Sequence, residues 1–223
     1  MTRLLYAGVV GPLLFIVVFL IEGFTRPGYS QWRNFVSQLA TGPGGWVQVL
    51  NFYVCGLLVL AFAFALRWEL KGTRGAIGAP VLLGAFALTL LLAGTFSTDP
   101  ALGYPPGVPA VRTPTGTIHG VAGLLAFTTL PAAAFVMAWH FAREGERAWM
   151  LYSIAVGVVV LVMFFASGFT SQADASGSWH NAPTGFLQRI AILAGFTWIS
   201  AVAWRFVSQH GLTRSDMPHQ AAA

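Results

Sequence analysis

Six long apolar stretches constrain this chain more than any other feature. A membrane-spanning helix needs about 20 predominantly apolar residues, and the stretches that approach this length lie at residues 4–21, 46–66, 76–96, 117–142, 148–169 and 187–208. Only 9% of the 223 residues are charged, against about 25% in a typical soluble domain. The sequence therefore predicts an all-α integral membrane protein built as a bundle of six transmembrane helices.

The first apolar stretch resembles a secretory signal because Arg3 precedes it. It is longer than the usual apolar region of a signal, however, and it ends in IEGFTRPG without a small-x-small cleavage site. We therefore expect it to remain as the first helix of a single membrane domain over residues 1–209. The polar residues 210–223 are expected to form a flexible C-terminal tail.

The distribution of basic residues predicts the orientation of the helices. Of the 12 Lys and Arg residues, eight lie on the face that carries both termini: Arg3, Arg67, Lys71, Arg74, Arg143, Arg147, Arg205 and Arg214. The positive-inside rule then places both termini in the cytoplasm of a multi-pass protein of the cell membrane. Because the basic residues flank apolar runs and form no stripe, no nucleic-acid partner is expected.

Three long loops on the opposite face predict a structured extracytoplasmic cap. They span residues 22–45, 97–116 and 170–186, whereas two to eight residues suffice to join packed helices. The first loop also predicts a short interfacial helix near residues 30–41, which Ser30 would cap and Gly42 would end. Its apolar side chains follow helical spacing, at Trp32, Phe35, Val36 and Leu39.

The charged residues of this face have two interpretations, which the sequence leaves open. Three acids follow or end apolar stretches, and three arginines accompany them: Glu22, Asp99 and Asp174, with Arg26, Arg33 and Arg189. Charges near hydrocarbon usually pair with one another or face a cavity. The acids and arginines either neutralise each other and fix the cap, or they line a pocket that opens outward.

Uncharged polar residues in the outer halves of the helices extend the candidate site. Gln48 and Asn51 lie one turn apart, His119 and Gln188 begin their helices, and Ser37 lies one turn from Arg33. Such side chains either join helices by hydrogen bonds or line a pocket. His119 and His180 have no metal-binding spacing, and no glycine-rich phosphate loop is present. No metal and no cofactor are therefore expected.

Several motifs resemble a known family. The segments RPGYSQWRNFVSQLATGPGGWVQVLNF, STDPALGYPPG, IHGVAG and GFLQR are similar to those of the "domain of unknown function 998" (DUF998) family of membrane proteins, from about residue 8 to 206. The resemblance draws attention to Arg26, Tyr29, Ser37, Asp99, His119, Gln188 and Arg189. Members often carry two histidines near the start of the fourth helix, whereas TPTGTIHGVAG has only His119.

Three functions follow as hypotheses. The first is a protein that binds a membrane lipid or another amphipathic small molecule in an outward-facing polar pocket, with Arg26, Arg33 and Arg189 on a phosphate group. The second is an intramembrane enzyme acting on a lipid or isoprenoid, with Glu22 or Asp99 as the proton donor. The third is a small transporter subunit. The sequence predicts neither the ligand nor the oligomeric state.

Overall fold

The computed structural model describes residues 2–73 and 75–215, which fold into six α-helices without a β-strand. All six helices are long and apolar enough to cross a membrane. This confirms the predicted all-α, multi-pass membrane architecture. The helices are α1 (Thr2–Thr25), α2 (Trp46–Glu69), α3 (Gly78–Thr95), α4 (Pro114–Arg143), α5 (Arg147–Ala175) and α6 (Thr184–Ser215).

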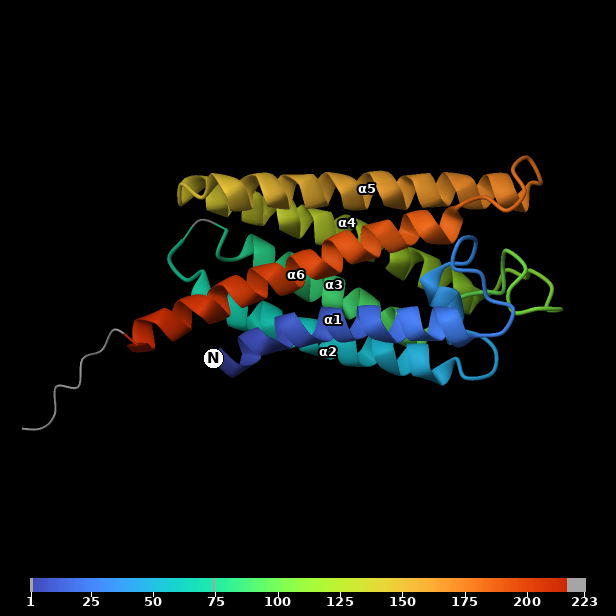
Figure 1. The fold of residues 1–223 in the computed structure, drawn as a ribbon, viewed down its shortest axis with the longest axis horizontal. Coiled ribbons are helices and arrows are strands. Elements are labelled where there is room, and N and C mark those ends of the chain that lie inside the picture. Colours follow the sequence, from blue (N-terminus) through green and yellow to red (C-terminus); the bar gives the residue numbers. More distant parts are fainter. Residues whose placement is uncertain (1, 74, 216–223) are drawn as a thin grey trace, which may run out of the picture.

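The helices form a closed ring in chain order. Each helix packs against the next, and α6 returns to pack against α1. Figure 1 shows the three longer connections gathered at one end of the bundle and the N-terminus at the other end. We call the first end the cap. The loops of the cap are therefore neighbours in space although they are far apart in sequence.

The predicted helix near residues 30–41 is present as a short 3-10 helix, η1 (Val36–Ala40). Turns precede it, and the Ser30 hydroxyl accepts a hydrogen bond from the Arg33 N–H at 3.3 Å. η1 contacts α1, α2 and α6, and its residues Val36 and Leu39 are buried. It therefore covers the end of the bundle at the cap.

Two helices extend beyond the apolar stretches that predicted them. α5 continues through polar residues to Ala175, and Gly177 follows with φ of +77°, a backbone conformation that ends many helices. α6 continues to Ser215, so the segment expected to be a flexible tail from residue 210 begins within a helix. Residues 216–223 of that segment lie outside the described residues.

Large apolar side chains fill the centre of the ring, among them Phe62, Phe86, Phe141 and Trp198. Close helix packing depends on small residues. A Cβ atom at Gly8, for example, would lie 2.4 Å from Cγ of Phe62, so α1 can approach α2 this closely only at a glycine.

The cytoplasmic location of the termini stays a prediction from charge.

Candidate ligand chamber and its cap

A cavity of about 70 Å³, which we call the chamber, lies inside the half of the bundle nearest the cap. Its walls come mainly from α3, α4 and α6, with Phe15 of α1 and Phe52 of α2, and η1 forms its roof. Most of the lining is apolar. The polar lining residues are Ser37, Thr89, His119 and Gln188.

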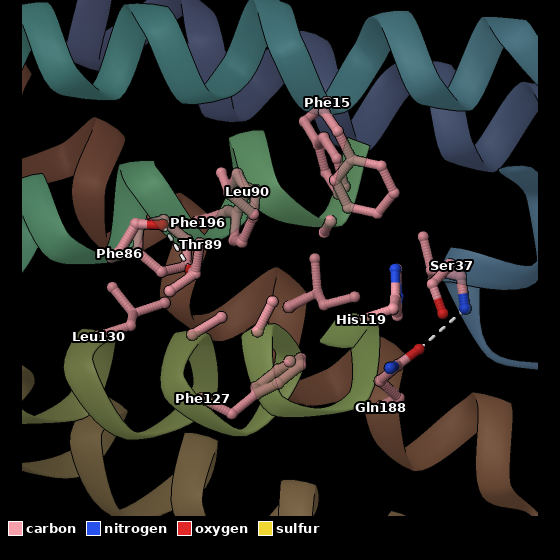
Figure 2. A pocket seen from close by; sticks show the side chains of 17 residues that line it. Phe15, Ser37, Phe86, Thr89, Leu90, His119, Phe127, Leu130, Gln188 and Phe196 are labelled. Carbon is pink, nitrogen blue, oxygen red and sulfur yellow. Dashed lines mark hydrogen bonds between the residues drawn. The ribbon is translucent and has the colours of Figure 1, made fainter. Parts of the chain in front are cut away.

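Three of these polar residues gather at one end of the chamber. Figure 2 shows Ser37, His119 and Gln188 together beneath η1, with Phe86 and Leu130 toward the other end. The Thr89 hydroxyl, in contrast, donates to the Phe86 carbonyl within its own helix at 2.6 Å. The chamber therefore has a polar end at the cap and an apolar end deeper in the bundle.

His119 is held in a defined orientation at the start of α4. Its helix begins at a Thr113 cap, whose hydroxyl accepts from the Gly116 N–H at 3.0 Å. The imidazole is 7% exposed, and its Nδ1 lies 2.8 Å from the Phe96 carbonyl oxygen. Since a carbonyl only accepts, Nδ1 carries a hydrogen and Nε2 of the neutral ring is an acceptor.

Gln188 joins α6 to the roof of the chamber. Its side-chain oxygen Oε1 accepts from the Val36 N–H at 2.8 Å, which places the amide Nε2 as the remaining donor. Ser37 follows directly in η1 and lines the same end. One hydrogen bond thus fixes both the position of the roof and the direction of the Gln188 amide.

An ion pair joins the first loop of the cap to the end of α5. Arg33 donates from Nε and Nη2 to the two carboxylate oxygens of Asp174, at 2.7 and 2.5 Å. The Ala182 N–H adds a third hydrogen bond to Asp174 at 3.1 Å. Bidentate pairs of this kind are among the stronger hydrogen-bonded contacts in proteins. The Asp174 hydrogen bond also raises the pKa of Arg33.

Arg189 fixes the first loop onto α6. Its guanidinium donates to the carbonyl oxygens of Gln31, Asn34 and Gly185 at 2.8, 3.0 and 2.9 Å, and to the Tyr29 hydroxyl. Arg189 is only 6% exposed. Burial raises the pKa of Tyr29 to about 12 despite the nearby guanidinium, so the phenol stays neutral at physiological pH.

Glu22 and Asp99 complete the cap. Glu22 pairs with Arg26 one turn along the chain, and Arg26 also donates to the Pro43 and Gly44 carbonyls at 2.5 and 3.1 Å. Asp99 accepts from the hydroxyl and N–H of Thr113 at 2.6 and 3.0 Å. The Thr113 hydroxyl lowers the pKa of Asp99 below its usual value.

The family model described as "Protein of unknown function (DUF998)" matches residues 9–205 of the chain. The chain belongs to this family. No curated protein and no solved structure matches it. The resemblance found in the motifs is therefore confirmed, and the function of this DUF998 protein has to be argued from its own residues.

The residues predicted from the sequence divide into three groups in this DUF998 protein. Ser37, His119 and Gln188 line the chamber. The cap contains Glu22, Arg26, Tyr29, Arg33, Asp99, Asp174 and Arg189. Gln48 and Asn51 are buried between α1 and α2, where the Asn51 amide donates to the Phe15 carbonyl at 3.1 Å and to Gln48 Oε1 at 3.2 Å.

Two buried amides of the cap were missed by the sequence analysis. Asn34 donates to the Leu102 carbonyl at 3.1 Å and Gln38 to the Ala101 carbonyl at 2.5 Å, so both fasten the first loop to the second. Their signal was present, since the amides are four residues apart on the predicted short helix.

Trp32 is exposed and contacts residues that follow α5. Its indole N–H donates to the Asn181 carbonyl at 3.0 Å, and its ring stacks on Phe186.

The lining also limits the chemistry of the chamber. No Asp, Glu, Lys or Arg is among its lining side chains. The three candidate acids bond to Arg26, Thr113 and Arg33 instead. Across residues 2–73 and 75–215, no group of three His, Cys, Asp or Glu side chains is placed to hold a metal. The chamber can bind through shape and neutral hydrogen bonds.

Proposed function

We propose that this DUF998 protein binds a single-chain amphipathic molecule, with its apolar chain in the chamber and its polar end beneath η1. The observation that carries the proposal is the polarity gradient of the chamber, from Ser37, His119 and Gln188 to Phe86 and Leu130. A lipid in the leaflet on the cap side has the same gradient, with its head at the surface and its chain toward the bilayer centre.

The length of the chamber supports this proposal. His119 and Leu130 both line it and lie eleven positions apart on α4, which corresponds to about 16 Å at 1.5 Å per residue. Half of the hydrocarbon thickness of a bilayer is about 15 Å. A chain that extends from His119 to Leu130 would therefore reach the level at which a leaflet ends.

The small volume excludes a two-chain lipid, and the walls of the chamber would have to separate to admit even one slender chain from His119 to Leu130. The chamber measures about 70 Å³, whereas an engineered protein cavity of about 150 Å³ takes up one benzene molecule. Apolar chains gain roughly 0.8 kcal/mol for each methylene group removed from water. A ligand whose chain already lies in the hydrocarbon of the bilayer gains little of this free energy on binding. The selectivity of the chamber would therefore depend on the polar end of the ligand.

Two glycines of α4 provide a matched test. Gly123 lines the chamber and Gly120, one turn earlier, does not. A Cβ atom at either position has no neighbour within 4 Å, so both positions accept a side chain at its point of attachment. A side chain on a helix leans toward the N-terminus, and a leucine at position 123 would extend toward His119 and obstruct the polar end.

The measurement is the lipid content of purified wild type, Gly123→Leu and Gly120→Leu, by quantitative mass spectrometry of the extracted lipids. We expect one single-chain amphipath to be enriched over bulk lipid in wild type and Gly120→Leu, and about tenfold less of it in Gly123→Leu, as a loss of about 1.4 kcal/mol produces. Bulk lipid alone in all three proteins would overturn the proposal.

The two other hypotheses remain alternatives. An enzyme with a carboxylic acid as proton donor draws no support from the lining, because Glu22, Asp99 and Asp174 bond to residues of the cap. A transporter subunit draws no support from any single contact in the described part of the chain.

A further inference from the structure

We infer that the polar end of the ligand is an uncharged hydroxyl group. This inference rests on the proposed function, because it concerns the same chamber and names the class of molecule that the chamber would select. It follows from the hydrogen-bonding capacity that Ser37, His119 and Gln188 retain after their bonds to the protein are counted.

His119 presents an acceptor. Its Nδ1 hydrogen is directed to the Phe96 carbonyl at 2.8 Å, and the ring also lies against the Ala93 carbonyl. With the hydrogen on Nδ1, the neutral ring offers the lone pair of Nε2 to a ligand. The Phe52 and His119 rings make an edge-to-face contact with 6.2 Å between their centroids. This contact limits rotation of the imidazole. A ligand atom that meets Nε2 must therefore donate a hydrogen.

Gln188 presents a donor. An N–H group can only donate, so the side-chain atom that meets the Val36 N–H at 2.8 Å is the oxygen. The Nε2 amide then has hydrogens to give to a ligand. The Ser37 hydroxyl at the same end can either donate or accept.

A charged head group would have no ionic partner in the chamber. Apart from the neutral imidazole of His119, the lining contains no acidic or basic side chain, and the nearby guanidinium of Arg33 is bonded to Asp174. Arg189 does not line the chamber; it directs Nη1 to three carbonyl groups and Nη2 to Tyr29, and its Nε has no partner. Burial of a phosphate or an ammonium group without a partner is costly, so the chamber disfavours both.

A hydroxyl group matches the two fixed partners better than other neutral groups. It can accept from the Gln188 amide and donate to His119 Nε2 at the same time. The oxygen of a ketone, an ester or an ether can only accept a hydrogen bond. Such a ligand would therefore leave Nε2 of His119 without a donor. A buried acceptor without a donor loses more free energy than one hydrogen bond contributes.

The test compares four probes of equal chain length on the purified protein in nanodiscs. These are 1-dodecanol, its methyl ether, dodecyl phosphate and dodecylamine, with the bound fraction measured by native mass spectrometry. We expect 1-dodecanol to bind about tenfold more tightly than each of the others, the ratio that the loss of one buried hydrogen bond produces. Equal or tighter binding of the ether, the phosphate or the amine would overturn the inference.

A charge-introducing variant sharpens this test. Gln188→Glu keeps an oxygen for the Val36 N–H and replaces the amide donor by a carboxylate. We expect its preference to change from 1-dodecanol to dodecylamine by about tenfold, since a charge-assisted hydrogen bond is roughly twice as strong as a neutral one. Gln172→Glu adds the same charge at an exposed position of α5, and should keep the preference of the wild type. An unchanged preference in Gln188→Glu would contradict the assignment.

The outcomes separate this inference from the proposed function. If dodecyl phosphate binds best and Gly123→Leu abolishes its binding, the chamber is a binding site and the hydroxyl inference is wrong. If none of the four probes binds, or if Gly123→Leu leaves all binding unchanged, the proposed function itself is wrong. The comparison of the four probes in the wild type decides the inference even if Gln188→Glu does not fold.

Discussion

In the cap, charged side chains meet partners within the protein, whereas the chamber directly beneath it is lined by neutral polar groups. Arg33 and Asp174 bond to each other through two hydrogen bonds, and Arg189 bonds to three carbonyl groups. His119 and Gln188 bond to backbone groups of the protein and also line the chamber. Charge near a membrane surface can therefore identify loop anchors, whereas partly satisfied neutral groups lie both at the chamber and, as at Gln48, outside it.

The largest effect of breaking this arrangement is expected at Arg189. Arg189→Met would remove the donor to the Gln31 and Asn34 carbonyl groups and to the Tyr29 hydroxyl, and would release the first loop from α6. We expect a loss of about 3 kcal/mol or more in the free energy of unfolding, because each unsatisfied buried group costs about 1–3 kcal/mol. The measurement is the loss of helical circular dichroism during titration with a denaturing detergent.

Arg112→Met provides the control for this substitution. Arg112 belongs to the same face but is exposed, and substitutions of this kind usually change stability by less than about 0.5 kcal/mol. Equal stability of Arg189→Met and Arg112→Met would show that the buried arginine does not hold the cap.

A smaller effect is expected at the pair of Arg33 and Asp174. The Asp174 side chain is fully buried and that of Arg33 is 33% exposed, so water compensates for only part of the lost bonds. In a double-mutant cycle of Arg33→Met and Asp174→Asn, we expect a coupling energy of about 1–2 kcal/mol. The pair Arg33→Met and Glu146→Gln, at opposite ends of the bundle, should be additive. A coupling energy near zero between Arg33→Met and Asp174→Asn would show that the ion pair does not stabilise the cap.

The smallest effect concerns pH and Asp99. Its pKa is lowered in the folded protein from a usual value of 3.8, chiefly by the Thr113 hydroxyl. A lowered carboxyl pKa contributes stability above pH 3.8, and that contribution is lost as the pH falls through the lowered value. Asp99→Asn should therefore be less stable than the wild type at pH 7, with a smaller difference at pH 3.

Thermal unfolding midpoints at the two pH values test this, and Thr113→Val provides a second variant in which the hydroxyl donor is absent. Both variants should show a weaker pH dependence than the wild type in the acidic range. A difference between wild type and Asp99→Asn that is the same at pH 7 and pH 3 would contradict the role of the Asp99 carboxylate.

The sequence predicted the fold well because length and hydropathy alone determine which segments can span a bilayer. Two helices ended later than predicted for a physical reason. Hydropathy shows where apolar residues end, but the hydrogen bonds of α5 continue through Gln172 and Asp174 until Gly177. The ends of such helices depend on backbone geometry, which hydropathy does not report.

The candidate site was predictable only in part. His119 and Gln188 stood out as polar residues at helix starts, and both line the chamber. Gln48 and Asn51 showed the same pattern, yet Asn51 bonds to the Phe15 carbonyl of α1 and to Gln48 within α2. The pattern places a polar residue on a helix, but the rotation of that helix within the ring decides whether the side chain meets a neighbour or a cavity. Pairing of Arg33 with Asp174 across 141 positions likewise needed the fold.

The central claim is that the charges hold the cap and the neutral chamber binds the ligand. The most direct test measures two quantities, bound amphipath per protein and thermal midpoint, in wild type, Arg33→Met and Gly123→Leu. The account predicts that Arg33→Met lowers the midpoint while the folded protein retains its amphipath, and that Gly123→Leu loses the amphipath at an unchanged or higher midpoint. Loss of the amphipath in folded Arg33→Met together with its retention in Gly123→Leu would contradict the account, because binding would then follow the charges.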